Sequence, residues 1–328
     1  MSNTIIAVIA LALLFDFLNG IHDSSNIVAT MISSRALSPR AALGLTALAN
    51  FLGPFILGVA VAKTIGEEIV AAEAINEFVL IAALSAAIFW NLVTWYLGFP
   101  SSSSHTLIGG FVGAVGIGAG WQAIQFGGLE KILIALFASP VIGFAAGYII
   151  LRATILLSWN ATPSINGFFR RGQIVTALAL ALSHGTNDAQ KTMGIITLAL
   201  LINGNISSFS VPIWVIGACA LMIGLGSALG GWRLIRTLGG KFYKIRPVDG
   251  FASQLASSAV ILAASLVGGP VSTTQVVSSA IMGVGTAERA NKVRWGVAQE
   301  ILVTWVLTIP ISALLAAGIY FLLEQFLR

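Results

Sequence analysis

The chain has 328 residues, of which 57% are hydrophobic and only 9% are charged. A soluble domain carries about 25% charged residues, so most of the surface of this protein cannot face water. The formal net charge of +5 does not indicate a nucleic-acid-binding protein, because the Lys and Arg residues lie in short loops between apolar runs, where they set membrane topology. The lone Cys219 excludes a disulfide framework or a cysteine-based zinc site within the chain.

Long apolar runs follow one another along the chain and predict an all-α polytopic membrane protein. A helix that crosses the hydrocarbon core needs about 20 mainly apolar residues, and the shorter runs fit re-entrant segments. The first run lacks a preceding basic region, so we expect it to be a span and not a cleaved signal peptide. The runs are Ile5–Leu18, Ala41–Ala62, Phe78–Leu97, Ile132–Leu151, Ile174–Ile202, Val211–Leu229, Leu255–Val267 and Leu302–Leu323.

Two polar motifs occur twice, in the same order. Residues 19–26 (NGIHDSSN) match residues 184–191 (HGTNDAQK). Residues 98–105 (GFPSSSSH) match residues 268–275 (GGPVSTTQ). Matches in one order and at nearly one offset indicate an internal duplication. The predicted division is a first repeat, a cytoplasmic connecting segment and a second repeat, at residues 1–151, 152–172 and 173–328.

Basic residues occupy different loops in the two repeats. The loop after the first span holds Arg35 and Arg40, whereas the matching loop 203–210 holds no basic residue. The next loop holds one base and four acids in the first repeat, but five bases at 233–246 in the second. By the positive-inside rule the repeats are inverted, with both termini outside the cell. Loop charges do not distinguish a re-entrant hairpin from two full crossings at each Pro-Ser/Thr segment, because both return to the starting side, and we predict a re-entrant hairpin there.

Inverted repeats with paired interruptions are typical of secondary transporters, whose sites lie at the repeat interface near the middle of the membrane. Two other classes fit less well. A membrane hydrolase using Ser104 and His105 would need its base to return from elsewhere in the chain, and no Gly-x-Ser-x-Gly elbow is present. In an anion channel, the buried acids would repel the permeating anion unless a cation were bound beside them.

Few ionisable residues lie inside the apolar runs. A charge at the centre of a membrane helix costs at least ~2.5–3.5 kcal/mol on insertion scales, so each one marks a candidate functional site. These residues are Asp16, Asp23, Asp188, Lys191 and Glu300.

The first repeated motif has helical spacing, so three polar residues share one face in each repeat. They are Asn19, Asp23 and Asn26 in the first repeat and His184, Asp188 and Lys191 in the second. The structural alternative for Lys191 is a buried ion pair with Asp188 that only links helices. Gly20 and Gly185 permit either a close helix approach or a break.

The second repeated motif is a proline followed by hydroxyl residues. Proline interrupts a helix, and a hydroxyl run that opens the next half-helix would present free backbone N–H groups and a positive dipole end. Such neutral donors suit a small tetrahedral oxyanion, although single Ser and Thr residues often only pack between membrane helices. The candidate anion-binding residues are Ser102, Ser103, Ser104, Ser272, Thr273 and Thr274.

Both motifs closely resemble those of the PiT family of inorganic phosphate transporters, over nearly the whole chain. The resemblance implies alternating-access import of phosphate in symport with a cation, with the Asp of each repeat holding the cation and the Ser/Thr runs holding phosphate. This chain departs from animal members, which carry Glu where it has Asn50 and Gln254, and from many members in ending the second run with Gln275.

The candidate cation ligands are carboxylate and amide side chains, whose oxygens favour Na⁺, held at Asp23 and Asp188. A proton relay would use chains of Asp, Glu and His, in which this chain is poorer than the family members that it resembles. Its members are Asp23, Asn26, Asn50, Asn187, Asp188 and Gln254, with Asn19, His105, Lys191 and Gln275 as supporting residues. A proton-coupled phosphate or metal–phosphate carrier and a sulfate permease stay open as alternatives. We expect a non-enzymatic protein of the cell (inner) membrane, with no cofactor, lipid as its surroundings and a homodimer as one candidate assembly.

Overall fold

A computed structural model describes residues 3–56, 58–69, 75–241 and 243–327. These residues form helices and no β-strand, which confirms the predicted all-α membrane fold. The α-helices are α1 (Asn3–Ser33), α2 (Pro39–Ile56), α3 (Ala60–Glu67), α4 (Glu77–Leu97), α5 (Ser103–Gly118), α6 (Phe126–Leu157), α7 (Ile165–Ile202), α8 (Ile213–Leu229), α9 (Trp232–Arg236), α10 (Pro247–Leu266), α11 (Thr273–Glu288) and α12 (Trp295–Leu327). Single turns of 3₁₀-helix (Trp121–Ala123, Ala290–Lys292) precede α6 and α12, and a π-helical turn (Thr237–Lys241) follows α9.

Five described helices, α1, α4, α6, α10 and α12, are long and apolar enough to cross a membrane. Two further spans are bent: α2 and α3 meet at 75°, and α8 and the segment Trp232–Gly239 meet at 58°. Counting each bent pair as one span gives up to seven. Helix α7 has 38 residues, but the polar motif at 184–191 lies in its middle.

The two Pro-Ser/Thr segments form the tips of matching helical hairpins. Gly98 follows the last residue of α4, and Gly268 comes shortly after the end of α10. Both glycines have a φ of 76°, a left-handed backbone conformation that glycine adopts without strain. Helices α5 and α11 then begin within the hydroxyl runs, and each has 16 residues. At 1.5 Å per residue such a helix is about 24 Å long, too short to cross a core about 30 Å thick.

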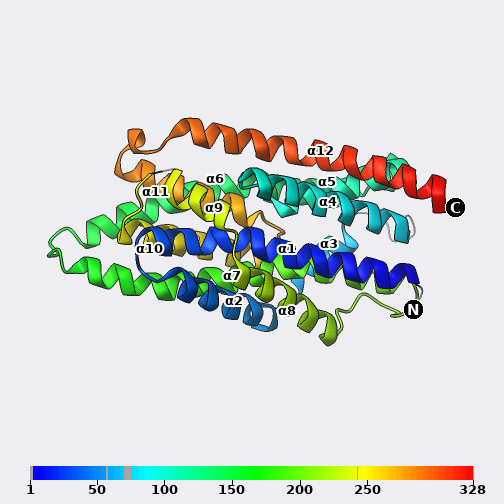
Figure 1. The fold of residues 1–328 in the computed structure, drawn as a ribbon, viewed down its shortest axis with the longest axis horizontal. Coiled ribbons are helices and arrows are strands. Elements are labelled where there is room, and N and C mark those ends of the chain that lie inside the picture. The colour runs from blue at the N-terminus through cyan, green and yellow to red at the C-terminus, as the bar shows by residue number, and fades with distance from the viewer. Residues whose placement is uncertain (1–2, 57, 70–74, 242, 328) are drawn as a thin grey trace.

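The first six helices and the last six follow the same order of lengths, 31, 18, 8, 21, 16 and 32 residues against 38, 17, 5, 20, 16 and 33. Hairpin α4–α5 starts and returns at the end of the molecule that holds both termini, whereas α10–α11 starts and returns at the opposite end (Figure 1). The exact domain division stays a prediction: residues 152–157 belong to α6, and 165–172 to α7.

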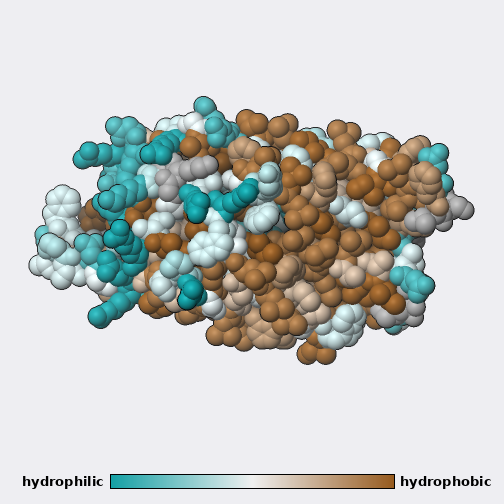
Figure 2. All heavy atoms as spheres, viewed as in Figure 1, coloured by the Kyte–Doolittle hydropathy of each residue, from teal (hydrophilic) through white to brown (hydrophobic). Residues whose placement is uncertain are grey.

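The surface is divided along the long axis. Hydrophobic side chains cover most of the visible face, and hydrophilic side chains gather at the end opposite the termini (Figure 2). This end carries the α1–α2 and α6–α7 loops (Figure 1). A broad apolar belt with one strongly polar end is the surface that a multi-pass membrane protein needs.

A cluster of charges closes the mouth of the second hairpin at the polar end. Arg246 bonds to Asp249, 2.9 Å away, and to Glu288, which also pairs with Lys292. The hydrogen bond to Asp249 raises the pKa of Arg246 above its ordinary value. Lys292 also lies 4.7 Å above the ring of Tyr243, whose pKa is raised by burial. These contacts hold the outer ends of α10 and α11 together.

Glycines let the long central helices approach their neighbours closely. A Cβ atom at Gly20 of α1 would collide with the carbonyl oxygen of Ile223 in α8. A Cβ atom at Gly185 of α7 would collide with that of Asn50 in α2. Because α1 and α7 continue unbroken through both positions, these glycines serve close packing and not helix breaks.

Cysteine labelling in intact cells tests the inverted topology. In a Cys219→Ala background, single cysteines replacing the exposed residues Ser38 and Thr162 should react only with reagent delivered from the cytoplasm. Cysteines replacing the exposed Gln122 and Asn205 should react only from outside. Ser38 and Asn205 lie in the matching loops after α1 and α7. Labelling of Ser38→Cys and Asn205→Cys from the same side would show parallel repeats and contradict the arrangement.

Candidate functional site

The two hydroxyl runs open α5 and α11 in the same way. Ser102 caps α5 by accepting a hydrogen bond from the backbone N–H of His105 at 3.2 Å. Ser272 caps α11 by accepting one from the N–H of Gln275 at 3.3 Å. The first N–H groups of a helix have no intrahelical acceptor, and one of them is satisfied by each cap. The others, together with the positive helix ends, face the hairpin tips and suit an anion.

The two hairpin tips touch, although they start from opposite ends of the molecule. The Ser104 hydroxyl donates to the carbonyl oxygen of Val271 at 3.0 Å. His105 Nδ1 lies 3.1 Å from Gln275 Nε2, and these residues occupy matching places in the two repeats. All four side chains are buried. The positive ends of two half-helices therefore meet inside the protein.

Asp23 joins α1 to the start of α11. Its Oδ1 accepts hydrogen bonds from the Thr274 hydroxyl at 2.7 Å and from Asn26 Nδ2 at 3.0 Å. His22 Nδ1 lies 2.9 Å from the same oxygen. The other oxygen, Oδ2, is buried and has no hydrogen-bond partner among the described residues. This oxygen can bind a further group.

Asp188 makes the corresponding connection from α7. Its Oδ2 accepts a hydrogen bond from the Thr273 hydroxyl at 2.9 Å, and its Oδ1 pairs with Lys191. Lys191 also donates to the carbonyl oxygen of Val271 at 3.0 Å, so its ammonium group lies at the second hairpin tip. Among the residues whose burial is described, Lys191 is the only buried Lys or Arg. It places one fixed positive charge beside both hairpins.

His184 links the two aspartates, a role that sequence spacing did not reveal. Its Nε2 lies 3.0 Å from Asp188 Oδ2 and 3.8 Å from Asp23 Oδ2. One ligand atom from each of the three residues lies within 4.8 Å of the others, close enough for a shared metal ion. Asn50 supports the ring, with its Oδ1 3.2 Å from His184 Nδ1 and its Nδ2 donating to Ser227 at 2.7 Å.

Two predicted cation ligands make their contacts elsewhere. Asn187 donates to the Ser265 hydroxyl at 2.9 Å and to the carbonyl oxygen of Gly269 at 3.3 Å. Its own side-chain oxygen is buried and has no partner among the described residues. Gln254 donates to Thr30 at 2.8 Å and accepts from Thr176 at 2.7 Å. These contacts use both ends of the Gln254 amide, and neither joins it to an aspartate. The structure thus brings together Asp23, Asn26, Asp188 and, through His184, Asn50.

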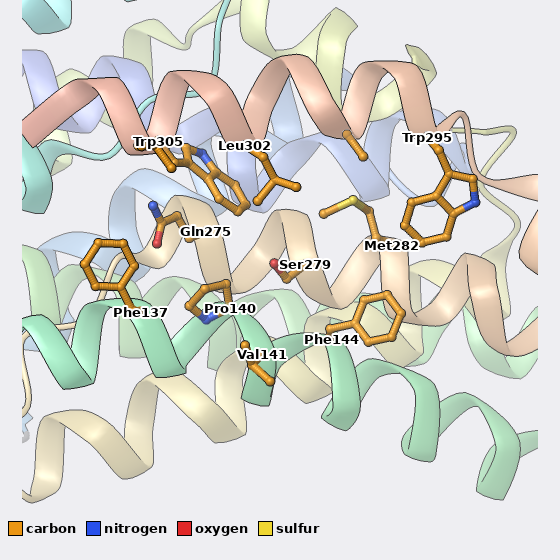
Figure 3. A pocket seen from close by; sticks show the side chains of 12 residues that line it. Phe137, Pro140, Val141, Phe144, Gln275, Ser279, Met282, Trp295, Leu302 and Trp305 are labelled. Carbon is orange, nitrogen blue, oxygen red and sulfur yellow. The ribbon is translucent and has the colours of Figure 1, made fainter.

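Cavities beside the hairpins differ in character. One of about 440 Å³ lies between α6, α11 and α12 and is lined mainly by apolar side chains such as Phe137 and Leu302 (Figure 3). Gln275 reaches its edge. The apolar lining does not suit phosphate. A cavity of about 50 Å³ lies between α1 and α4, where buried nitrogens of His22 and Asn91 have no partner among the described residues.

Comparison with known proteins agrees with this architecture. The model of the phosphate transporter family matches residues 19–162 and 156–316. A probable low-affinity inorganic phosphate transporter of Bacillus subtilis is 48% identical over 324 residues, covering 98% of this chain and 97% of the relative. One from Rhizobium meliloti is 44% identical over 319 residues, covering 97% and 96%.

A solved structure titled as the sodium-dependent phosphate transporter has the same fold. Its TM-score is 0.91, and the match covers 99% of this chain and 100% of that one, at 23% sequence identity. The family and these relatives are transporters and not enzymes. The matched family model and the close relatives identify this chain as a member of the phosphate transporter family, which confirms the resemblance found in its motifs.

Proposed function

We propose that the chain imports inorganic phosphate by symport with Na⁺ through alternating access. The observation that carries the proposal is the pair of hydrogen bonds from Thr273 to Asp188 and from Thr274 to Asp23. They join the start of a half-helix, which attracts anions, to two buried carboxylates, which attract cations. An anion and a cation can therefore be held in contact, as symport requires.

Phosphate would lie between the tips of the two hairpins. Donors there include the free backbone N–H groups of α5 and α11 and the hydroxyls of Ser102 and Ser272, which accept in the helix caps and keep their own protons to donate. Lys191 lies beside them, and Ser104, Thr273 and Thr274 would turn their hydroxyl protons to the anion when it binds. The anion-binding residues of this proposal are Ser102, Ser103, Ser104, Ser272, Thr273 and Thr274. Most of these donors are neutral, which favours release of the anion as well as its capture.

Electrostatics explains why phosphate would need a cation. Two unit charges 4 Å apart interact by about 4 kcal/mol at an effective dielectric constant of 20. A phosphate beside Asp23 and Asp188 would be repelled by an energy of that size. Lys191 does not offset this repulsion fully, because its positive charge is already paired with Asp188. A cation on the free oxygen of Asp23 would remove much of the repulsion, so binding of either ion would favour the other.

The ligand chemistry favours Na⁺ over a proton as that cation. Carboxylate, amide and hydroxyl oxygens are the ligands that hard cations prefer. Asp23, Asp188 and Thr274 supply such oxygens at one point in the membrane. The structural relative is named as sodium-dependent, which supports the same choice.

The inverted hairpins support alternating access. Hairpin α4–α5 opens toward one end of the molecule and α10–α11 toward the other (Figure 1). In inverted-repeat transporters, motion of one repeat against the other exposes a central site to each side in turn. Separation of the tip contact between Ser104 and Val271 would accompany that motion.

Charge removal at the aspartates tests the cation assignment. We expect Asp23→Asn and Asp188→Asn to lower Na⁺-driven phosphate uptake into proteoliposomes at least tenfold, because the amide loses the charge that binds the cation. Initial rates would be measured with labelled phosphate under an inward Na⁺ gradient, and separately under an inward proton gradient.

Asp249→Asn is the matched control, since Asp249 is also buried but contacts Arg246 at the mouth of the second hairpin. Its uptake should keep the same cation dependence as the unchanged protein. Wild-type uptake that follows only the proton gradient would replace Na⁺ with H⁺ in the proposal.

A hydroxyl deletion tests the anion assignment. Thr274→Val removes one hydroxyl of the second run and the hydrogen bond that it donates to Asp23, while Asn26 still donates to the same oxygen. We expect at least tenfold weaker phosphate uptake. Thr286→Val, which removes a hydroxyl bonded only within α11, should have little effect.

Competition identifies the preferred anion. Phosphate at neutral pH donates and accepts hydrogen bonds, whereas sulfate only accepts and would leave an acceptor at the site unpaired. Unlabelled phosphate and arsenate should therefore compete with labelled phosphate at least tenfold better than sulfate, a difference of about 1.4 kcal/mol. Equal competition by sulfate would instead favour a sulfate permease.

A further inference from the structure

Asp16 is a buried acid that the proposed transport site does not use. It lies in α1 and is fully buried, and neither carboxylate oxygen has a hydrogen-bond partner among the described residues. A buried carboxylate without a partner is costly, because it loses its hydration without compensation. A group that complements this charge is therefore expected beside it.

Two further buried side chains beside Asp16 carry oxygens without a hydrogen-bond partner among the described residues. The side-chain oxygen of Asn19, one helical turn along α1, is buried and has no partner among the described residues. The Thr192 hydroxyl on α7 lies beside the Asp16 carboxylate. It is buried and has no hydrogen-bond partner among the described residues. These three side chains offer carboxylate, amide and hydroxyl oxygens, the ligand set of a hard cation.

The group around Asp16 is distinct from the central aspartate pair. Asp16 precedes Asp23 by two helical turns, about 10 Å along α1. Asp16 interacts electrostatically with several titratable groups of the neighbouring helices. They are Asp188, His184 and Lys191 on α7 and the thiol of Cys219 on α8.

Only the first repeat has this acid. At the offset that aligns Asp23 with Asp188, the position matching Asp16 is Ala181. Asp16 and Asn19 belong to the part of α1 that leads from the N-terminal end of the molecule to Asp23 (Figure 1).

We propose that Asp16, Asn19 and Thr192 form an additional Na⁺ site, separate from the central one, on the path from the N-terminal end of the molecule to Asp23. The inference rests on the proposed Na⁺-coupled transport. The unpartnered oxygens of Asp16, Asn19 and Thr192 favour a bound Na⁺ over a proton on Asp16. A proton on Asp16 would satisfy only one of the other two oxygens, whereas one metal ion would complement all three residues.

Direct counting of bound ions tests the site. Purified full-length protein in detergent, without phosphate, would be titrated with ²²Na⁺. The Asp16→Asn variant should bind one Na⁺ fewer per chain than the wild type. Thr192→Val, a near-isosteric change, should raise the Na⁺ concentration at half-saturation of that ion at least fivefold. The control Thr197→Val removes another buried hydroxyl of α7 that has no hydrogen-bond partner in the described part of the chain, and it should leave both values unchanged.

Parallel variants separate this inference from the proposed function. Asp23→Asn should lose a different Na⁺ and keep the one at Asp16. If Asp16→Asn and Thr192→Val bind Na⁺ as the wild type does, the additional site is wrong and the central site stands. If Asp23→Asn loses no ion but Asp16→Asn does, the additional site stands and the central assignment is wrong. Unchanged melting temperatures would show that the variants are folded.

Discussion

Two hydrogen bonds, from Thr273 to Asp188 and from Thr274 to Asp23, fix the centre of this protein. A carboxylate deep in a membrane protein must find donors or cations, because neither lipid nor an apolar core supplies them. Consecutive residues at the start of α11 supply one donor to each long central helix. The register of α1 and α7 against the second hairpin, and the position of the first hairpin through its contact at Val271, follow from this requirement.

Small residues make that arrangement sterically accessible. Gly20 and Gly53 bring α1 against α8 and α2 against α7, since a Cβ atom at either would collide with a carbonyl oxygen of the neighbouring helix. Gly113 of α5 packs against Ala313 of α12 in the same way, which ties the first hairpin to the last helix. Close backbone contact replaces the hydrophobic effect, which does not hold helices together in lipid. The polar centre is therefore held by a rigid apolar frame.

The sequence predicted features that depend on local rules. Prolines and hydroxyl runs predicted the two hairpins, and basic loops predicted two repeats of opposite orientation. Contacts between distant segments could not be inferred in this way. The bridge from His184 to Asp23 joins residues of different repeats, and spacing along one helix does not reveal it. Gln254 resembled a cation ligand by its chemistry, but the packing of α10 directs it to Thr30 and Thr176.

Differences between the repeats give the two aspartates unequal electrostatic surroundings. Asn26 and Lys191 occupy matching positions three residues after Asp23 and Asp188, and each donates to its own aspartate. The donor is neutral in the first repeat and positively charged in the second. Asp188 is thus compensated by Lys191, while Asp23 Oδ2 has no hydrogen-bond partner among the described residues and only the longer contact with His184. Under the proposed mechanism a coupling cation is therefore attracted more strongly to Asp23 than to Asp188. The two repeats share one fold but contribute unequally to the cation site.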